Sequence, residues 1–261
     1  MRSVRFTPGP DAGLGQDPLF GVLEDDATIS IISGDPIYSG IQKTAAKIEL
    51  NKVRLLAPII PRSKVVCIGK NYADHAAEMG GVVPEEPIIF LKPNTSVIGP
   101  NDTIVWPDMS ERVDHEAELA IVIGRICKDV PKERVNDVIF GYTIANDVTA
   151  RDLQKKDGQW TRAKGFDTFC PIGPWVDTDF IPGTQKITAT IAGEVKQSAQ
   201  ISDMIFDVPT IINFVSRVMT LLPGDIILTG TPAGIGPMVA GEKATMAIEG
   251  LGELTNKVSA K

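Results

Sequence analysis

The chain has few histidines and cysteines, which limits the kinds of metal site it can form. It contains two histidines, His75 and His115, so any metal site must be built mainly from carboxylates rather than from several imidazoles. The three cysteines, Cys67, Cys127 and Cys170, are odd in number and lack CxxC spacing. We therefore expect core cysteines in a reducing cytoplasm, and neither a disulfide framework nor a zinc ribbon.

Two further absences bear on the partners of the protein. Lys and Arg total 26 against 33 Asp and Glu, so the net charge of −7 argues against a general electrostatic attraction to nucleic acid or an anionic membrane. No apolar run approaches the roughly 18–20 residues of a membrane span. The first residues, MRSVRFTPGPDAGLG, lack the apolar stretch of a secretory signal. We expect a cytoplasmic protein that acts on small molecules, without nucleic-acid or membrane partners.

Short apolar runs separated by Gly and Pro dominate the rest of the chain. The patterning predicts strands over 27–32, 64–68, 88–91, 119–123, 143–145, 186–191 and 225–228. Helices are predicted over 72–79, 131–135, 149–155 and 208–219. Strands outnumber helices and βα alternation is absent over most of the length. The sequence therefore predicts an α+β, mostly β fold with a mixed, largely antiparallel core.

Residues 1–57 differ in character from the remainder. They hold weak strand patterns and Gly/Pro turns, but no cluster of charged residues. The segment 56–61, LAPIIP, reads as a rigid connector because each proline biases the residue before it to an extended backbone. We predict a small N-terminal β module over 1–57 and a main domain over 58–261.

An acidic pair lies in the segment VDHEAELAIVIG at 113–124. In a strand, Glu116 and Glu118 share one face, and both faces turn apolar after Glu118. Two adjacent carboxylates at the edge of a core repel each other, and burial raises the cost of charging them. A divalent cation would offset that cost. The plainer alternative is a solvated strand start with two exposed acids.

A third acid, Asp147, follows the apolar run at 140–146 and precedes a predicted helix. It could simply cap that helix. Together with Glu116 and Glu118 it could instead supply three carboxylates to Mg²⁺ or Mn²⁺, leaving positions open for water and substrate.

Four segments in this order, HEAELAIVIG, NDVTARDLQ, AKGFDTFCPIGPW and LPGDIILTGTPAGIG, resemble the fumarylacetoacetate hydrolase family. Upstream, GKNYADHAAEMG is similar to the lid segment of its small bacterial and mitochondrial members. Those members include acylpyruvate hydrolases, oxaloacetate decarboxylases or tautomerases, and hydroxymuconate and hydroxyheptadienedioate isomerases. The resemblance covers about residues 56–261. It implies a mixed β-sandwich or β-roll core and a homodimer.

The resemblance also implies roles for individual residues. It assigns a metal to Glu116, Glu118 and Asp147, a lid dyad to His75 and Glu78, the active-site lysine to Lys164, and substrate contacts to Lys70, Gln154 and Thr231. Lys70 stands where some relatives have Arg, so a bidentate grip on a carboxylate is not expected there. The glycines of TGTPAGIG spell neither a dinucleotide motif nor a P-loop.

Three neighbours of the acids receive structural roles. His115 points to the strand face opposite Glu116, and we expect it to be structural. Arg151 and Asp152 are expected to brace the turn at Asp147 rather than to touch substrate.

The implied substrates share a 2-oxo acid or enol head, whose carboxylate and 2-oxygen can chelate a metal. The first expectation is C–C bond cleavage, such as acylpyruvate hydrolysis or oxaloacetate decarboxylation. There His75 and Glu78 would activate water, and Lys164 would stabilise the developing oxyanion. The alternative is a 2-hydroxyhepta-2,4-diene-1,7-dioate or 5-carboxymethyl-2-hydroxymuconate isomerase, or an oxaloacetate tautomerase. A non-catalytic ligand-binding relative is the third possibility.

Overall fold

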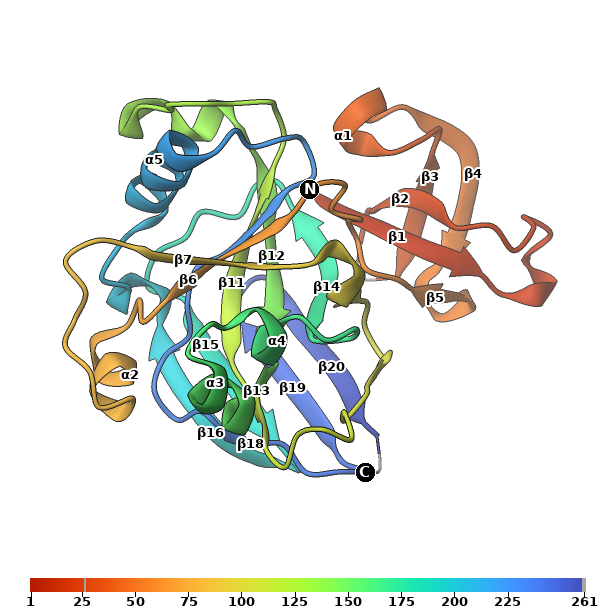
Figure 1. Ribbon diagram of the computed structural model, residues 1–261. Helices are drawn as coiled ribbons and strands as arrows, with labels where there is room; N and C mark the ends of the chain where they lie inside the picture. The colour runs from red at the N-terminus through yellow and green to blue at the C-terminus, as the bar shows by residue number, and fades with distance from the viewer. Residues whose placement is uncertain (26, 260–261) are drawn as a thin grey trace.

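The computed structural model describes residues 1–25 and 27–259 (Figure 1). Its strands in the first half are β1 (Arg2–Pro8), β2 (Leu19–Leu23), β3 (Thr28–Ile32), β4 (Lys43–Glu49), β5 (Val53–Leu55), β6 (Val65–Gly69), β7 (Ile88–Lys92), β8 (Val97–Ile98), β9 (Thr103–Ile104), β10 (Val113–His115) and β11 (Ala117–Ile123). The second half adds β12 (Ile139–Asn146), β13 (Thr149–Ala150), β14 (Cys170–Asp177), β15 (Lys186–Ile191), β16 (Glu194–Gln200), β17 (Ile226–Leu228), β18 (Gly236–Pro237), β19 (Lys243–Ile248) and β20 (Gly252–Val258).

Helices are short and few beside these strands. The α-helices are α1 (Pro36–Ser39), α2 (Ala73–Glu78), α3 (Arg151–Asp157), α4 (Thr161–Lys164) and α5 (Val208–Val218). Short 3-10 helices cover Pro10–Ala12, Leu50–Lys52, Asn94–Ser96, Lys132–Asp137 and Ile201–Asp203. Over the described parts of the chain, no helix combines the length and the apolar character needed to cross a membrane.

One twelve-stranded sheet runs through the molecule in the order β4-β3-β2-β1-β14-β12-β11-β17-β6-β7, and its two remaining strands, β5 and β8, pair with β1 and β14. A five-stranded sheet, β16-β15-β19-β20-β9, packs against it, and a small sheet, β13-β10-β18, lies beside them. Most pairs are antiparallel, while β17–β6, β14–β8 and β20–β9 are parallel. The predicted α+β, mostly β class with a largely antiparallel core is confirmed.

Strand β11 lies at the centre and is buried on both faces along its whole length. Leu119, Ile121 and Ile123 face the core shared with the five-stranded sheet. Ala120 and Val122 face a second core, on the opposite side of the main sheet. Because side chains alternate along a strand, residues 116 and 118 lie on the face of this second core, at its end.

The N-terminal strands β1–β5 form an extension with a small core of their own, which includes Val4, Phe6 and Ile29 (Figure 1). Strand β1 also pairs with β14, so these strands continue the main sheet. Ala57 and Ile59 of the expected connector are buried in the second core. The division of the chain after residue 57 stays a prediction.

The predicted helices agree with the structure except near the acids and at 131–135. The helix expected over 149–155 starts at Arg151, because Thr149 and Ala150 pair with β10 as a strand. The N-cap residue of this helix is Ala150, so the alternative that Asp147 caps it is wrong. The segment predicted as a helix over 131–135 is the 3-10 helix Lys132–Asp137. Helices α2 and α5 occupy their predicted places.

The link between β6 and α2 is anchored by Asn71, which is fully buried. Its Nδ2 donates to the carbonyl oxygens of Phe206 at 3.0 Å and Thr229 at 2.7 Å, and its Oδ1 accepts from the Phe206 N–H at 2.8 Å. This one side chain therefore ties the start of α2 to two other segments.

We expect Asn71→Leu to lower the free energy of unfolding by about 3 kcal/mol, because buried main-chain groups lose their partners. Urea denaturation measures the change. Asn51→Leu, at an exposed position, is the control and should change stability by less than about 0.5 kcal/mol. Equal effects of the two substitutions would contradict the anchoring role.

Candidate active site

Strand register brings the three acids together. In the antiparallel pair β11–β12, Ala117 is opposite Asn146 and Glu118 is opposite Ala145. Glu116 thereby lies opposite Asp147, whose N–H donates to the Glu116 carbonyl at 2.9 Å. One carboxylate oxygen from each of Glu116, Glu118 and Asp147 lies within 4.8 Å of the others. All three side chains are buried, at most 4% exposed, so the alternative of exposed acids is wrong.

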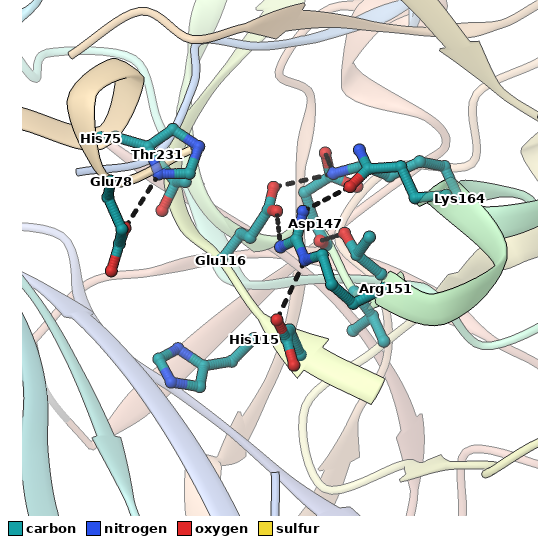
Figure 2. A network of polar contacts seen from close by, with 12 residues as sticks. His75, Glu78, His115, Glu116, Asp147, Arg151, Lys164 and Thr231 are labelled. Atoms are coloured by element: carbon teal, nitrogen blue, oxygen red, sulfur yellow. Dashed lines mark hydrogen bonds and ion pairs between the residues drawn. The ribbon is translucent and has the colours of Figure 1, made fainter. Parts of the chain in front are cut away.

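Two buried lysines contact these acids, and Figure 2 shows one of them, Lys164, beside Glu116 and Asp147. Lys164 at the end of α4 places its Nζ 2.7 Å from Glu116 Oε2 and 2.7 Å from Asp147 Oδ2. Lys92, which the sequence analysis did not select, lies on β7 with its Nζ 2.6 Å from Asp147 Oδ1 and 3.1 Å from the Val148 carbonyl. Both oxygens of Asp147 thus accept from an ammonium group.

Arg151 serves a different acid from the one expected. Its guanidinium donates to Glu116, to Asp114 Oδ2 at 2.9 Å and to Gln154 Oε1 at 2.7 Å. It therefore orients one member of the acidic cluster and a residue of the pocket wall. The expectation that Arg151 braces the turn at Asp147 is wrong.

The other two neighbours of the acids are tied to protein groups. Asp152 accepts from the Ser110 hydroxyl at 2.7 Å and the Glu111 N–H at 3.0 Å, and so braces the segment before β10 rather than the Asp147 turn. His115 is fully buried, with Nδ1 3.2 Å from Gln197 Oε1, as expected for a structural residue. Burial lowers the pKa of His115, which favours a neutral ring.

The charges of the site follow from these contacts. Burial opposes ionisation of Glu116, but Lys164 and Arg151 outweigh it and hold the pKa of this carboxyl well below its usual range. Glu118 accepts from the Gly230 N–H at 2.6 Å, yet burial, Asp147 and Glu116 together raise its pKa well above the usual value. Lys164 stays protonated, because Asp147 and Glu116 overcome its burial and raise its pKa to about 12.

His75 and Glu78 lie on one side of α2, as their spacing predicts. His75 Nδ1 is 3.2 Å from Glu78 Oε2, and His75 is 5% exposed. Glu78 also accepts from the Gly234 N–H, with Oε1 at 3.2 Å. Helix α2 is thus docked on the loop that follows β17 (Figure 2).

One cavity collects nearly all the residues selected from the sequence. Its walls include Lys70, His75, Glu116, Glu118, Asp147, Gln154, Lys164 and Thr231, and Glu78 joins through His75. The apolar side chains of Ile68, Met79, Phe90 and Trp160 complete the wall. The rings of Phe90 and Trp160 pack edge to face, with their centroids 5.1 Å apart. The enclosed space is about 30 Å³, room for only one or two water molecules. The role of each residue stays a prediction.

The profiles of two known protein families together match almost the whole chain. Residues 64–259 match the profile described as fumarylacetoacetate (FAA) hydrolase C-terminal, and residues 1–58 match the profile described as Rv2993c-like, N-terminal. The chain belongs to the fumarylacetoacetate hydrolase family. The resemblance carried by the four sequence segments is thereby confirmed, and so is the fold that it implies.

Relatives in this family span several organisms. Protein Rv2993c of Mycobacterium tuberculosis is 59% identical over 231 residues, covering 87% of this chain and 85% of that protein. Oxaloacetate tautomerase Fahd2a, mitochondrial, of Rattus norvegicus is 44% identical over 219 residues, covering 80% of this chain and 70% of that protein.

Solved structures of this family superpose closely. 5-Carboxymethyl-2-hydroxymuconate delta-isomerase from Mycobacterium smegmatis is 48% identical, with a TM-score of 0.91 over all of both chains. Maleylpyruvate hydrolase from Sphingobium sp. SYK-6, solved with manganese(II) ion and pyruvate, is 32% identical, with a TM-score of 0.81 over 100% of this chain and 99% of that one. These relatives of the chain are enzymes that process small molecules.

The raised pKa of Glu118 predicts that cation binding is linked to a proton. A divalent cation needs the ionised carboxylate, so it competes with the proton whose binding to Glu118 is favoured by burial and by two neighbouring acids. We expect Mn²⁺ binding to release protons, and the affinity for Mn²⁺ to rise as the pH rises, because fewer protons compete. Calorimetry in two buffers of different ionisation enthalpy counts the protons.

Glu118→Gln is the matched control, since it removes the titrating group and leaves the contacts of Lys92 and Lys164 in place. It should bind Mn²⁺ more weakly and release no proton from this position. Identical heats for the unaltered protein in both buffers would contradict the linkage.

Proposed function

We propose that this protein is a divalent-metal-dependent enzyme that acts on 2-oxo or 2-hydroxydienoic mono- or dicarboxylic acids by stabilising an enolate, and that it cleaves a C–C bond, as in acylpyruvate hydrolysis or oxaloacetate decarboxylation. The observation that carries the proposal is the grouping of three buried carboxylates, a protonated lysine and a His–Glu pair around one cavity. A relative solved with manganese(II) ion and pyruvate supports it, since pyruvate has the same 2-oxo acid head.

The donor set fits Mg²⁺ or Mn²⁺. It consists of carboxylate oxygens from Glu116, Glu118 and Asp147, without histidine or cysteine, and hard dications prefer such ligands. A cation held there supplies Lewis acidity toward a 2-oxo group, a contribution of several kcal/mol in the transition state.

The balance of charge favours a substrate with two carboxylates. Glu116 and Asp147 lie within hydrogen-bond distance of the three basic groups Lys92, Lys164 and Arg151, so that the three acids, once ionised, are matched by three positive charges although Glu118 contacts none of them directly. A bound dication then leaves the cavity with excess positive charge, to which Lys70 on the wall adds one more. A dianionic substrate would neutralise most of this excess.

The remaining groups of the chain have separate tasks in this scheme. The Lys164 ammonium stabilises negative charge that develops on the substrate oxygen. His75, oriented by Glu78, accepts a proton from water for hydrolysis or moves a proton along the substrate. Arg151 holds the side chain of Gln154 at the wall. The cavity beside α2 offers about 30 Å³, and we expect α2 or the side chains beside it to move when such a substrate binds.

The second candidate is keto–enol or double-bond isomerisation at the same site, as in an oxaloacetate tautomerase or a hydroxyheptadienedioate isomerase. It is favoured by the rat oxaloacetate tautomerase at 44% identity and the mycobacterial delta-isomerase at 48%. These reactions need the enolising groups but no attacking water. A cytoplasmic location and a homodimeric assembly stay predictions made from the sequence.

A substrate panel tests the proposal. We expect the purified protein to turn over oxaloacetate or an acylpyruvate with Mg²⁺ or Mn²⁺, and to lose at least about 100-fold of its rate in EDTA, since several kcal/mol of stabilisation disappear. Pyruvate release reports cleavage or decarboxylation, and the ultraviolet absorbance of the enol reports tautomerisation. A rate that EDTA leaves unchanged would sink the metal scheme, and exclusive tautomerisation would favour the second candidate.

We expect hydrolysis and decarboxylation to depend to different extents on the lid dyad of His75 and Glu78. His75→Ala should slow hydrolysis of an acylpyruvate by about 100-fold or more, because the base for water is lost. Decarboxylation of oxaloacetate, which needs no attacking water, should fall less than about tenfold. Both rates are measured at saturating metal, with Asp74→Ala on the exposed side of α2 as the control. Equal losses in both reactions would indicate that His75 only shapes the cavity.

A further inference from the structure

Gln197 in β16 is fully buried beside the site and uses the whole hydrogen-bonding capacity of its side chain. Its Oε1 accepts from the Ala117 N–H at 2.9 Å and lies 3.2 Å from His115 Nδ1. Its Nε2 donates to Thr231 Oγ1 at 2.7 Å and to the Pro232 carbonyl at 2.7 Å. One amide thus joins β10, β11 and the loop at 230–236. None of the sequence motifs pointed to this residue.

Main-chain partners determine the direction of each of these bonds. The Ala117 N–H can only donate and the Pro232 carbonyl can only accept, so the amide of Gln197 has a single possible orientation. Thr231 Oγ1 must then accept from Gln197, and it donates its hydrogen to the Ala117 carbonyl at 2.9 Å. In this arrangement the hydroxyl hydrogen of Thr231 points at β11 and not into the cavity.

The same loop carries the docking point of the lid. Two residues after Pro232, the N–H of Gly234 donates to Glu78 at 3.2 Å. Gly234 has φ +95°, and a Cβ there would lie 2.1 Å from the carbonyl oxygen of Lys196. The loop therefore packs on the backbone of β16 directly beside Gln197, without space for a side chain.

We propose that Gln197 is a positioning residue, which couples the strand bearing Glu118 to the loop on which α2 docks. It holds the loop at 230–236 so that the Gly234 N–H meets Glu78, and it directs the Thr231 hydroxyl to β11. The catalytic consequence rests on the proposed function, whereas docking of α2 can be measured without any substrate.

Gln197→Glu removes the two hydrogen bonds that the amide donates and keeps the contacts of its oxygen. A carboxylate still accepts from Ala117 and His115, but it has no hydrogen for Thr231 or Pro232. We expect hydrogen exchange in residues 73–79, followed by mass spectrometry on the full chain, to become at least about tenfold faster. Gln200→Glu adds the same charge at an exposed position of the same strand and should exchange at the original rate.

Turnover supplies a second readout. If Gln197 acts through the Thr231 hydroxyl, adding Thr231→Val to Gln197→Glu should lower kcat little further, whereas independent roles would give additive losses. Thr231→Ser, which keeps the hydroxyl, should retain kcat within about threefold. Additive losses in the double variant would overturn the coupling through Thr231.

Gly234→Ala tests the loop from its other end and keeps the proposal falsifiable should Gln197→Glu fail to fold. It should also speed exchange in 73–79, because the loop must shift away from Lys196. Original exchange rates in folded Gln197→Glu, or in Gly234→Ala when the first variant does not fold, would overturn the proposal. If the variants exchange faster but the unaltered protein turns over none of the tested substrates, the proposed function is refuted and the docking role stays intact.

Discussion

The arrangement of this site depends on holding three carboxylates within 4.8 Å of one another inside a core. Removing each ionised group from water costs several kcal/mol, and mutual repulsion adds to that cost. The positive charges of Lys92, Lys164 and Arg151, which come from β7, α4 and α3, offset this cost through ion pairs with Asp147 and Glu116. These ion pairs thus connect segments that are far apart in the sequence. Glu118, the acid without a basic partner among the described ion pairs, has its pKa raised.

The surrounding sheets make this concentration of charge possible. Strand β11 is paired on both sides, with β12 and β17, and is buried on both faces, so its side chains have little freedom. Glu116 and Glu118 stand at the end of the face whose interior is Ala120 and Val122. The rigidity of the core thereby becomes rigidity of the acidic cluster, as the proposed cation site requires.

The acids were predictable from the sequence, and Lys164 from the family resemblance, but the contacts of Lys92 and Arg151 with the acids were not. A period of two puts Glu116 and Glu118 on one face, whatever the fold, and the apolar run after them indicates burial. Lys92 reads only as the polar end of an apolar run, and nothing in its spacing reveals contact with Asp147, 55 positions away. Strand β14 was missed because it contains Pro171 and Pro174, and proline normally argues against a central strand.

Local pattern also misjudged the segment after Asp147. Thr149 and Ala150 have enough helical character to extend the predicted helix, but pairing with β10 draws them into a strand. This shift moves Arg151 to the start of α3, from which its guanidinium reaches Glu116 and Asp114 instead of the Asp147 turn. Tertiary pairing thus decided a role that sequence spacing had assigned differently.

In the proposed function, the groups that would stabilise an enolate and the groups that would decide its fate lie on different parts of the structure. The acids and lysines stand on the core, where a substitution leaves a buried charge without a partner and is costly. The His75–Glu78 pair stands on a six-residue helix, and Glu78 is held by a main-chain donor, the N–H of Gly234. A main-chain donor is retained through any change of side chain that leaves the backbone in place. Under the proposed function, a change in this helix would therefore shift the balance between hydrolysis and isomerisation, while the acids and lysines would supply the step common to both.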